Sequence, residues 1–96
     1  MNIVFSKLAK RELDDACHYY NRELEGLGNR FREDIRQSVK RIAQHPQAWS
    51  IERGEIRKYV LHRFPYKILY SIETNHLFII AVAHQHRRPD YWVEKS

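Results

Sequence analysis

The chain has 96 residues, which is room for one domain around one hydrophobic core, so residues 1–96 are expected to form a single domain. Its 17 lysines and arginines outnumber 12 aspartates and glutamates, and the net charge of +5 favours an acidic partner: nucleic acid, an acidic protein segment or an anionic surface. A single cysteine excludes an intrachain disulfide, and no apolar run approaches the roughly 18 residues of a membrane span. With no signal peptide visible at the N-terminus, we expect a cytoplasmic protein without a membrane partner.

The first half of the chain predicts a short strand and two helices. Asn2 to Phe5 reads as the strand, and Ser6 is placed to cap the helix that follows. Apolar residues then recur at steps of three and four, interrupted by the glycines of residues 26–29 and ended by Pro46. These positions are Ala9, Leu13, Ala16, Tyr20 and Leu24 in the first helix and Leu27, Phe31, Ile35, Val39 and Ile42 in the second. The short link predicts an antiparallel helical hairpin.

The second half predicts a sheet. Residues 47–54 read as a loop in which Trp49 is either a lid on the core or a binding aromatic, with the lid favoured. Three strands follow, over residues 56–61, 66–73 and 77–83, separated by a turn at Phe64-Pro65 and a hairpin at residues 73–76. The last strand is apolar at every position, which is typical of a strand covered on both faces. The prediction is an α+β domain of order βααβββ, with the hairpin packed on a mainly antiparallel sheet.

Five short motifs occur in a specific order along the chain. They are Ala16-Cys17-His18-Tyr19-Tyr20, Gly-Leu-Gly-Asn-Arg-Phe at 26–31, Gly-Glu-Ile-Arg at 54–57, Arg-Phe-Pro-Tyr-Lys-Ile-Leu-Tyr at 63–70 and His-Gln-His-Arg-Arg-Pro-Asp-Tyr-Trp at 84–92. Together they resemble the RelE/ParE superfamily of toxins from bacterial type II toxin–antitoxin modules, also called plasmid stabilisation proteins. The likeness covers nearly the whole chain. The long hairpin and the paired tyrosines resemble the ParE branch more than the RelE branch.

The resemblance implies a cytoplasmic growth-arresting toxin of βααβββ fold that needs no cofactor and pairs tightly with a small cognate antitoxin. The acidic C-terminal tail expected of that antitoxin suits the positive charge of this chain, and an exposed sheet edge accepts an added strand through backbone hydrogen bonds. The resemblance also implies that the toxin contacts operator DNA only through the antitoxin.

Members of the ParE branch poison DNA gyrase and need no catalytic residues. For this role we expect a surface of the arginine-plus-aromatic kind that is enriched at binding hot spots. Its candidates for target or antitoxin binding are Arg57, Arg63, Arg87, Arg88, Tyr91 and Trp92. The alternative is structural: Arg57 pairs with Glu55, and the two C-terminal aromatics pack the tail onto the sheet.

The RelE branch instead cleaves mRNA on the ribosome without a metal, which needs a base, cations around the phosphate and an acid. Matching positions here are Lys58, Lys67, His86, Arg88 and Tyr91. The set is altered: Val60 stands where a second lysine is expected, and a lysine at 67 lacks the bidentate fork of the arginine that it replaces. We therefore favour the gyrase inhibitor over the metal-independent endoribonuclease.

A third hypothesis is a non-toxic nucleic-acid-binding domain. The basic charge supports it, but Glu33 and Asp34 interrupt the cations of the second helix. Tyr66 and Tyr70 share a strand face with isoleucines, which predicts a place in the core and not an exposed base-stacking platform. The histidines lack zinc-ligand spacing with a third ligand, so no metal site is expected.

Overall fold

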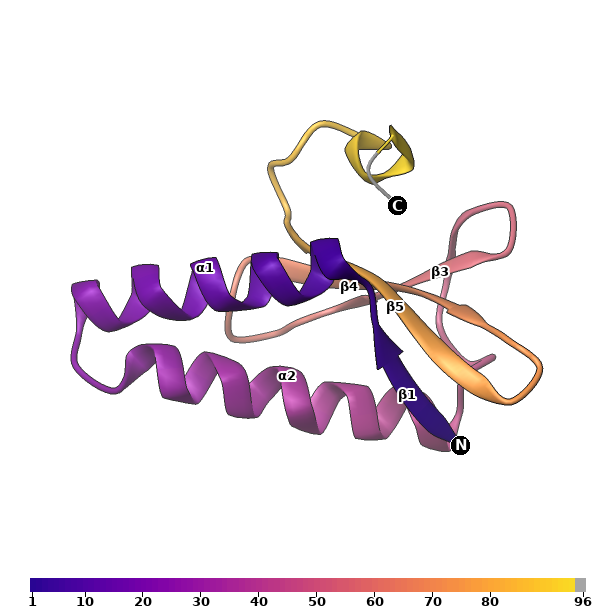
Figure 1. Ribbon diagram of the computed structural model, residues 1–96, viewed down its shortest axis with the longest axis horizontal. Helices are drawn as coiled ribbons and strands as arrows, with labels where there is room; N and C mark the ends of the chain where they lie inside the picture. The colour runs from indigo at the N-terminus through magenta and orange to yellow at the C-terminus, as the bar shows by residue number, and fades with distance from the viewer. Residues whose placement is uncertain (95–96) are drawn as a thin grey trace.

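A short N-terminal strand leads into a helical hairpin and then into a sheet (Figure 1). The computed structural model describes residues 1–94. Its elements are β1 (Asn2–Phe5), α1 (Lys7–Glu23), α2 (Leu27–Gln44), β2 (Ile51–Arg53), β3 (Ile56–Val60), β4 (Tyr66–Ile72), β5 (His76–His84) and the 3-10 helix η1 (Tyr91–Glu94). The strands form one five-stranded sheet of order β1-β5-β4-β3-β2, in which β1 runs parallel to β5 and the other pairs are antiparallel. The predicted α+β fold is confirmed.

The beginning of α1 is tied to the edge of β5. β1 pairs with β5 only as far as Ile79, and beyond that point α1 supplies the partners. Ser6 caps the helix, as predicted, by accepting from the Ala9 N–H at 2.9 Å, while its own hydroxyl donates to the Ile80 carbonyl at 2.7 Å. The Val82 N–H donates to Glu12 Oε1 at 2.8 Å. Two side chains of this helix region thus continue the hydrogen bonding that β1 begins.

The hairpin closes tightly where the two helices meet. Gly26 adopts φ +85°, a left-handed conformation that glycine tolerates best. Gly28 lies so close to α1 that an added Cβ would stand 2.1 Å from the Cys17 carbonyl oxygen. Its N–H donates to Asn21 Oδ1 at 2.7 Å. Figure 1 shows the two helices side by side in consequence.

The sheet is covered on both faces. The face toward the hairpin buries a core that includes Phe31, Ile35, Ile42, Ile68, Tyr70, Ile79 and Val82. The opposite face, called the outer face below, carries Leu69, Ile80, Ala81 and Ala83, which are buried in one cluster with Leu8 of α1 and with Tyr91 and Trp92. These two aromatics belong to the C-terminal segment, residues 85–94, drawn in yellow in Figure 1. The expectation that the last strand is covered on both sides is confirmed.

Two details depart from the sequence expectations. A β-bulge interrupts the β4–β5 ladder: Leu69 faces Ala81 and Tyr70 faces Ile79, so Ile80 is the extra residue and joins the outer face beside Ala81. Residues 51–53, expected as part of a loop, form strand β2 and pair with β3. The run has only three residues, and two of them, Glu52 and Arg53, are charged, so there was no alternation from which to predict a strand.

Candidate functional site

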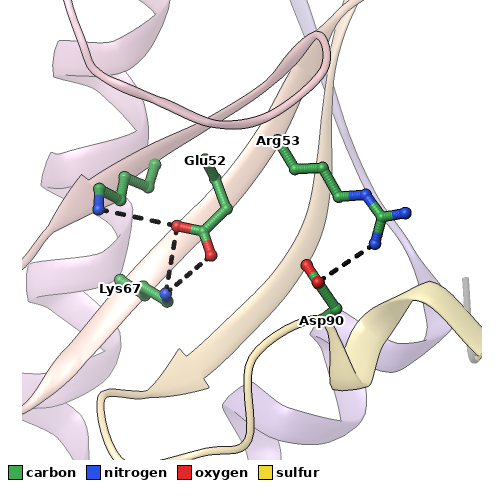
Figure 2. A network of polar contacts seen from close by, with 5 residues as sticks. Glu52, Arg53, Lys67 and Asp90 are labelled. Atoms are coloured by element: carbon green, nitrogen blue, oxygen red, sulfur yellow. Dashed lines mark hydrogen bonds and ion pairs between the residues drawn. The ribbon is translucent and has the colours of Figure 1, made fainter.

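Two lysines of the outer face share one carboxylate. Lys58 on β3 and Lys67 on β4 lie on neighbouring strands, and Glu52 of β2 reaches both. Glu52 Oε1 lies 3.8 Å from Lys58 Nζ, and Glu52 Oε2 lies 3.2 Å from Lys67 Nζ (Figure 2). The Glu52 side chain is only 14% exposed, so solvent screens this contact less than an ordinary surface ion pair.

A second ion pair joins β2 to the C-terminal segment. Arg53 Nη1 lies 3.3 Å from Asp90 Oδ2, and Figure 2 shows this pair beside the Glu52 contacts. Asp90 has φ +61°, in the left-handed region that aspartate visits more readily than most residues. The turn at Asp90 brings η1 back over the sheet, where Tyr91 and Trp92 are buried.

Glu12 holds the C-terminal segment to α1. Its Oε2 accepts from the Tyr91 hydroxyl, while its Oε1 accepts from the Val82 N–H. Burial raises the pKa of Glu12, although the bonds from Tyr91 and Val82 oppose the rise. Burial and the Glu12 carboxylate together raise the pKa of Tyr91, so its hydroxyl keeps its proton at neutral pH and remains a donor. The Arg87 guanidinium stacks on the Tyr91 ring, 4.0 Å from its centroid.

The candidate target-binding residues fall on two sides of the sheet. On the outer side Arg87 and Arg88 are exposed, whereas Tyr91 and Trp92 are 8% and 6% exposed and pack in the outer-face cluster. On the hairpin side, Arg57 donates to the Trp49 carbonyl at 2.6 Å and the Gln47 carbonyl at 3.2 Å; among residues 1–94 it makes no ion pair with Glu55.

Arg63, the remaining candidate, is exposed beside a groove of about 880 Å³ between α2 and the β3–β4 turn. The six candidates therefore do not form one patch.

The alternative catalytic candidates are only partly brought together. Lys67, Arg88 and Tyr91 line a small cavity of about 120 Å³ on the outer face, to which Arg87 and Asp90 also contribute. Lys58 does not line the cavity itself but forms an ion pair with Glu52, which does. His86 does not line this cavity. It lies on the exposed turn after β5, where its ring centroid is 5.2 Å from that of His84.

Trp49 is half-buried and packs edge-on against Tyr59, with 4.8 Å between ring centroids, as the predicted lid on the core would. Within the part of the chain that the structure describes, no three His, Cys, Asp or Glu side chains come together as metal ligands. No helix of residues 1–94 is long and apolar enough to cross a membrane.

The sequence matches, over residues 3–89, the family model described as the ParE toxin of type II toxin–antitoxin system, parDE. The chain belongs to the ParE toxin family. The resemblance drawn from the motifs is thereby confirmed. In fold, this ParE family member is similar to a chain from the chromosomal ParDE TA system of P. aeruginosa, with a TM-score of 0.78 and 19% identity over 88% of this chain and 95% of that one. No curated protein matches the sequence.

Two acidic residues of this ParE family toxin were missed in the sequence. Glu12 carried a signal, because it lies three residues after Ala9 and four before Ala16 and so falls on the buried stripe of α1. A carboxylate on such a stripe requires partners, which are Val82 and Tyr91 here. Nothing in the sequence pointed to Glu52, because its contacts with the two lysines depend on strand β2, which the sequence did not predict.

Proposed function

We propose that this chain is the toxin of a type II toxin–antitoxin module, acts in the cytoplasm as one domain over residues 1–96, and arrests growth by poisoning DNA gyrase. A cognate antitoxin neutralises it. Family membership supports the toxin role. The observation that carries the non-enzymatic mode of action is the pairing of both candidate catalytic lysines with Glu52.

Metal-free RNA cleavage requires cations and an acid or base that reach the scissile phosphate. Lys58 and Lys67 are engaged by Glu52. The Tyr91 hydroxyl donates to Glu12, and its raised pKa makes it a weaker proton donor to a leaving oxygen. His86 stands outside the cavity that Lys67, Arg88 and Tyr91 line. These contacts favour an inhibitor that acts by binding over the ribosome-dependent endoribonuclease.

Exposed Arg87 and Arg88 are the residues with which we propose that the toxin contacts gyrase. Arginine is enriched at binding hot spots, and Tyr91 beneath Arg87 gives that side chain a fixed platform. Arg57 has a structural part in this proposal, since it holds the carbonyls of the loop before β2. A nucleic-acid-binding domain is disfavoured because Tyr70 is buried and Tyr66 half-buried on the hairpin side.

The proposed antitoxin is a small protein with an acidic tail. The net charge of +5 attracts such a tail. Strand β1 lies at the edge of the sheet with Ile3 and Val4 exposed, and such an edge accepts a further strand through backbone hydrogen bonds. The similar P. aeruginosa structure comes from a ParDE system.

The test is a DNA-cleavage assay with purified gyrase and closed-circular plasmid. We expect the toxin to trap cleaved DNA, which appears as linear plasmid after denaturation, and the cognate antitoxin to prevent it. The variant Arg87→Ala/Arg88→Ala should need roughly tenfold more toxin for the same cleavage, a loss of about 1.4 kcal/mol.

Lys10→Ala/Arg22→Ala, which removes the same charge from exposed positions of α1, is the control and should act like the unmodified toxin. Absence of trapped cleavage at saturating toxin would contradict the proposal, and RNA cleavage on translating ribosomes would favour the alternative.

A further inference from the structure

Two lysines on the outer face surround one carboxylate of the same chain. We call Lys58 and Lys67 the two-lysine site. Their ammonium groups come from adjacent strands and converge within 3.8 Å and 3.2 Å of one carboxylate. At 38% and 25% exposure the lysine side chains are sheltered by the fold yet still reachable.

The surroundings of the site remain cationic even with that carboxylate in place. Arg87 and Arg88 line the cavity beside Lys67, and the two acids there, Glu52 and Asp90, are both paired with cations. A carboxylate and a phosphate are both held by ammonium groups through charge-assisted hydrogen bonds. Without Glu52, the two lysines would present two adjacent donors to a phosphate, with two arginines at the rim.

Glu52 is held in place by the local structure. Strand β2 pairs with β3 through Ile51 and Arg53 on either side of it, and the Lys58 N–H donates to the Ser50 carbonyl at 2.9 Å. The Arg53–Asp90 ion pair fastens the same strand to the C-terminal segment. With three residues β2 is short, so these flanking contacts set where its central carboxylate lies.

We propose that Glu52 is an intramolecular anion occupying a phosphate-binding site formed by Lys58 and Lys67, and that it keeps the outer face from binding single-stranded nucleic acid. This inference goes beyond the gyrase proposal, because it concerns a ligand that the outer face excludes and not the target that the toxin poisons. It assigns β2 a specificity role: the strand closes the surface on which RNA would otherwise lie.

The test compares Glu52→Gln with Glu55→Gln. Both substitutions add one positive charge, but Glu55 is an exposed residue of the β2–β3 turn that makes no ion pair among residues 1–94. The measurement is fluorescence anisotropy of a labelled single-stranded oligouridylate over a series of salt concentrations. Each phosphate neutralised on a single strand adds about 0.7 to the slope of log K against log salt.

Because Lys58 and Lys67 together form one phosphate-binding site, freeing them should steepen the slope of Glu52→Gln by about 0.7. If the proteins bind equally at 1 M salt, this corresponds to about fivefold tighter binding at 0.1 M salt. Glu55→Gln should stay close to the unmodified toxin, and adding Lys58→Gln/Lys67→Gln to Glu52→Gln should restore the original slope. Equal slopes for the two glutamate variants, or a gain that survives loss of both lysines, would overturn the proposal.

Circular dichroism establishes that each variant is folded. Should Glu52→Gln not fold, Glu52→Asp retains the charge but withdraws the carboxylate by one methylene. Its slope should then exceed that of the unmodified toxin, and an unchanged slope would overturn the proposal. The assay contains neither gyrase nor ribosomes, so its outcome is independent of whether the proposed target is correct.

Discussion

Replacing Tyr91 by phenylalanine removes one oxygen atom from the contact that fastens the C-terminal segment to α1. The ring remains in the outer-face cluster beneath Arg87, while Glu12 keeps the Val82 N–H and loses its other donor. A hydrogen bond to a charged group contributes about 1.5–3 kcal/mol. We take the lower end because Glu12 is partly exposed and solvent screens it.

A loss of about 1.5 kcal/mol lowers the melting temperature of a domain of this size by roughly 6–12 °C. The assay is urea unfolding followed by far-ultraviolet circular dichroism, on the unmodified toxin, Tyr91→Phe, Glu12→Gln and the double variant. The two single changes should be coupled by about 0.5 kcal/mol or more, since they remove the same contact. Tyr19→Phe, at an exposed tyrosine of α1, is the control and should change stability by less than about 0.5 kcal/mol.

The same set tests the raised pKa of Glu12. The Glu12 carboxyl has a higher pKa in the folded protein than in the unfolded chain. Between these two pKa values the folded state therefore binds more protons than the unfolded state. The toxin should therefore lose stability relative to Glu12→Gln as pH rises from the ordinary glutamate value of about 4.3 through the raised one. Additive single variants and a pH-independent difference would refute this account of the Glu12–Tyr91 contact.

Three further outcomes are expected. Gly28→Ala should cost about 3 kcal/mol in urea unfolding, because the new methyl group would meet the Cys17 carbonyl; an effect under about 1 kcal/mol would mean that the hairpin opens easily. Truncation after Pro89 uncovers the outer-face cluster and should lower the melting temperature by more than 10 °C, whereas an unchanged temperature would make the C-terminal segment a free contact surface. Arg87→Ala/Arg88→Ala should relieve growth arrest on induction while leaving the melting temperature within about 3 °C; a large loss of stability would assign these arginines a structural role.

The helices and the three long strands could be predicted because their signals are local. The apolar period of α1, the Ser6 cap and the Pro46 stop all act within a few residues of the structure that they determine. Strand β2 could not be predicted, because three residues are too few to show an alternating pattern. Its position depends on pairing with β3 and on the ion pair between Arg53 and Asp90. The β-bulge at Ile80 could not be predicted either, because the run from Leu77 to Ala83 is apolar at every position and shows no break in alternation.

The candidate site was predictable by residue type but not by arrangement. Sequence reasoning selected cations and aromatics, and these do cluster at Lys67, Arg87 and Arg88 on the outer face. Alternation along the strand predicts that Arg57 faces the side opposite Lys58, but it could not predict that Arg57 binds the Gln47 and Trp49 carbonyls. Nor could it foresee that Glu52 would pair with both lysines, since that contact joins three strands and exists only after folding.

The measurement that bears most directly on the proposed function is pulse incorporation of labelled thymidine and labelled methionine just after the toxin is induced in a bacterial host. Poisoning of gyrase predicts that thymidine incorporation falls first and that co-expressed antitoxin prevents the fall. Methionine incorporation falling first would contradict the gyrase proposal and return Lys58, Lys67 and His86 to the catalytic candidates. Unchanged incorporation of both labels, with folded toxin present, would contradict the toxin role itself.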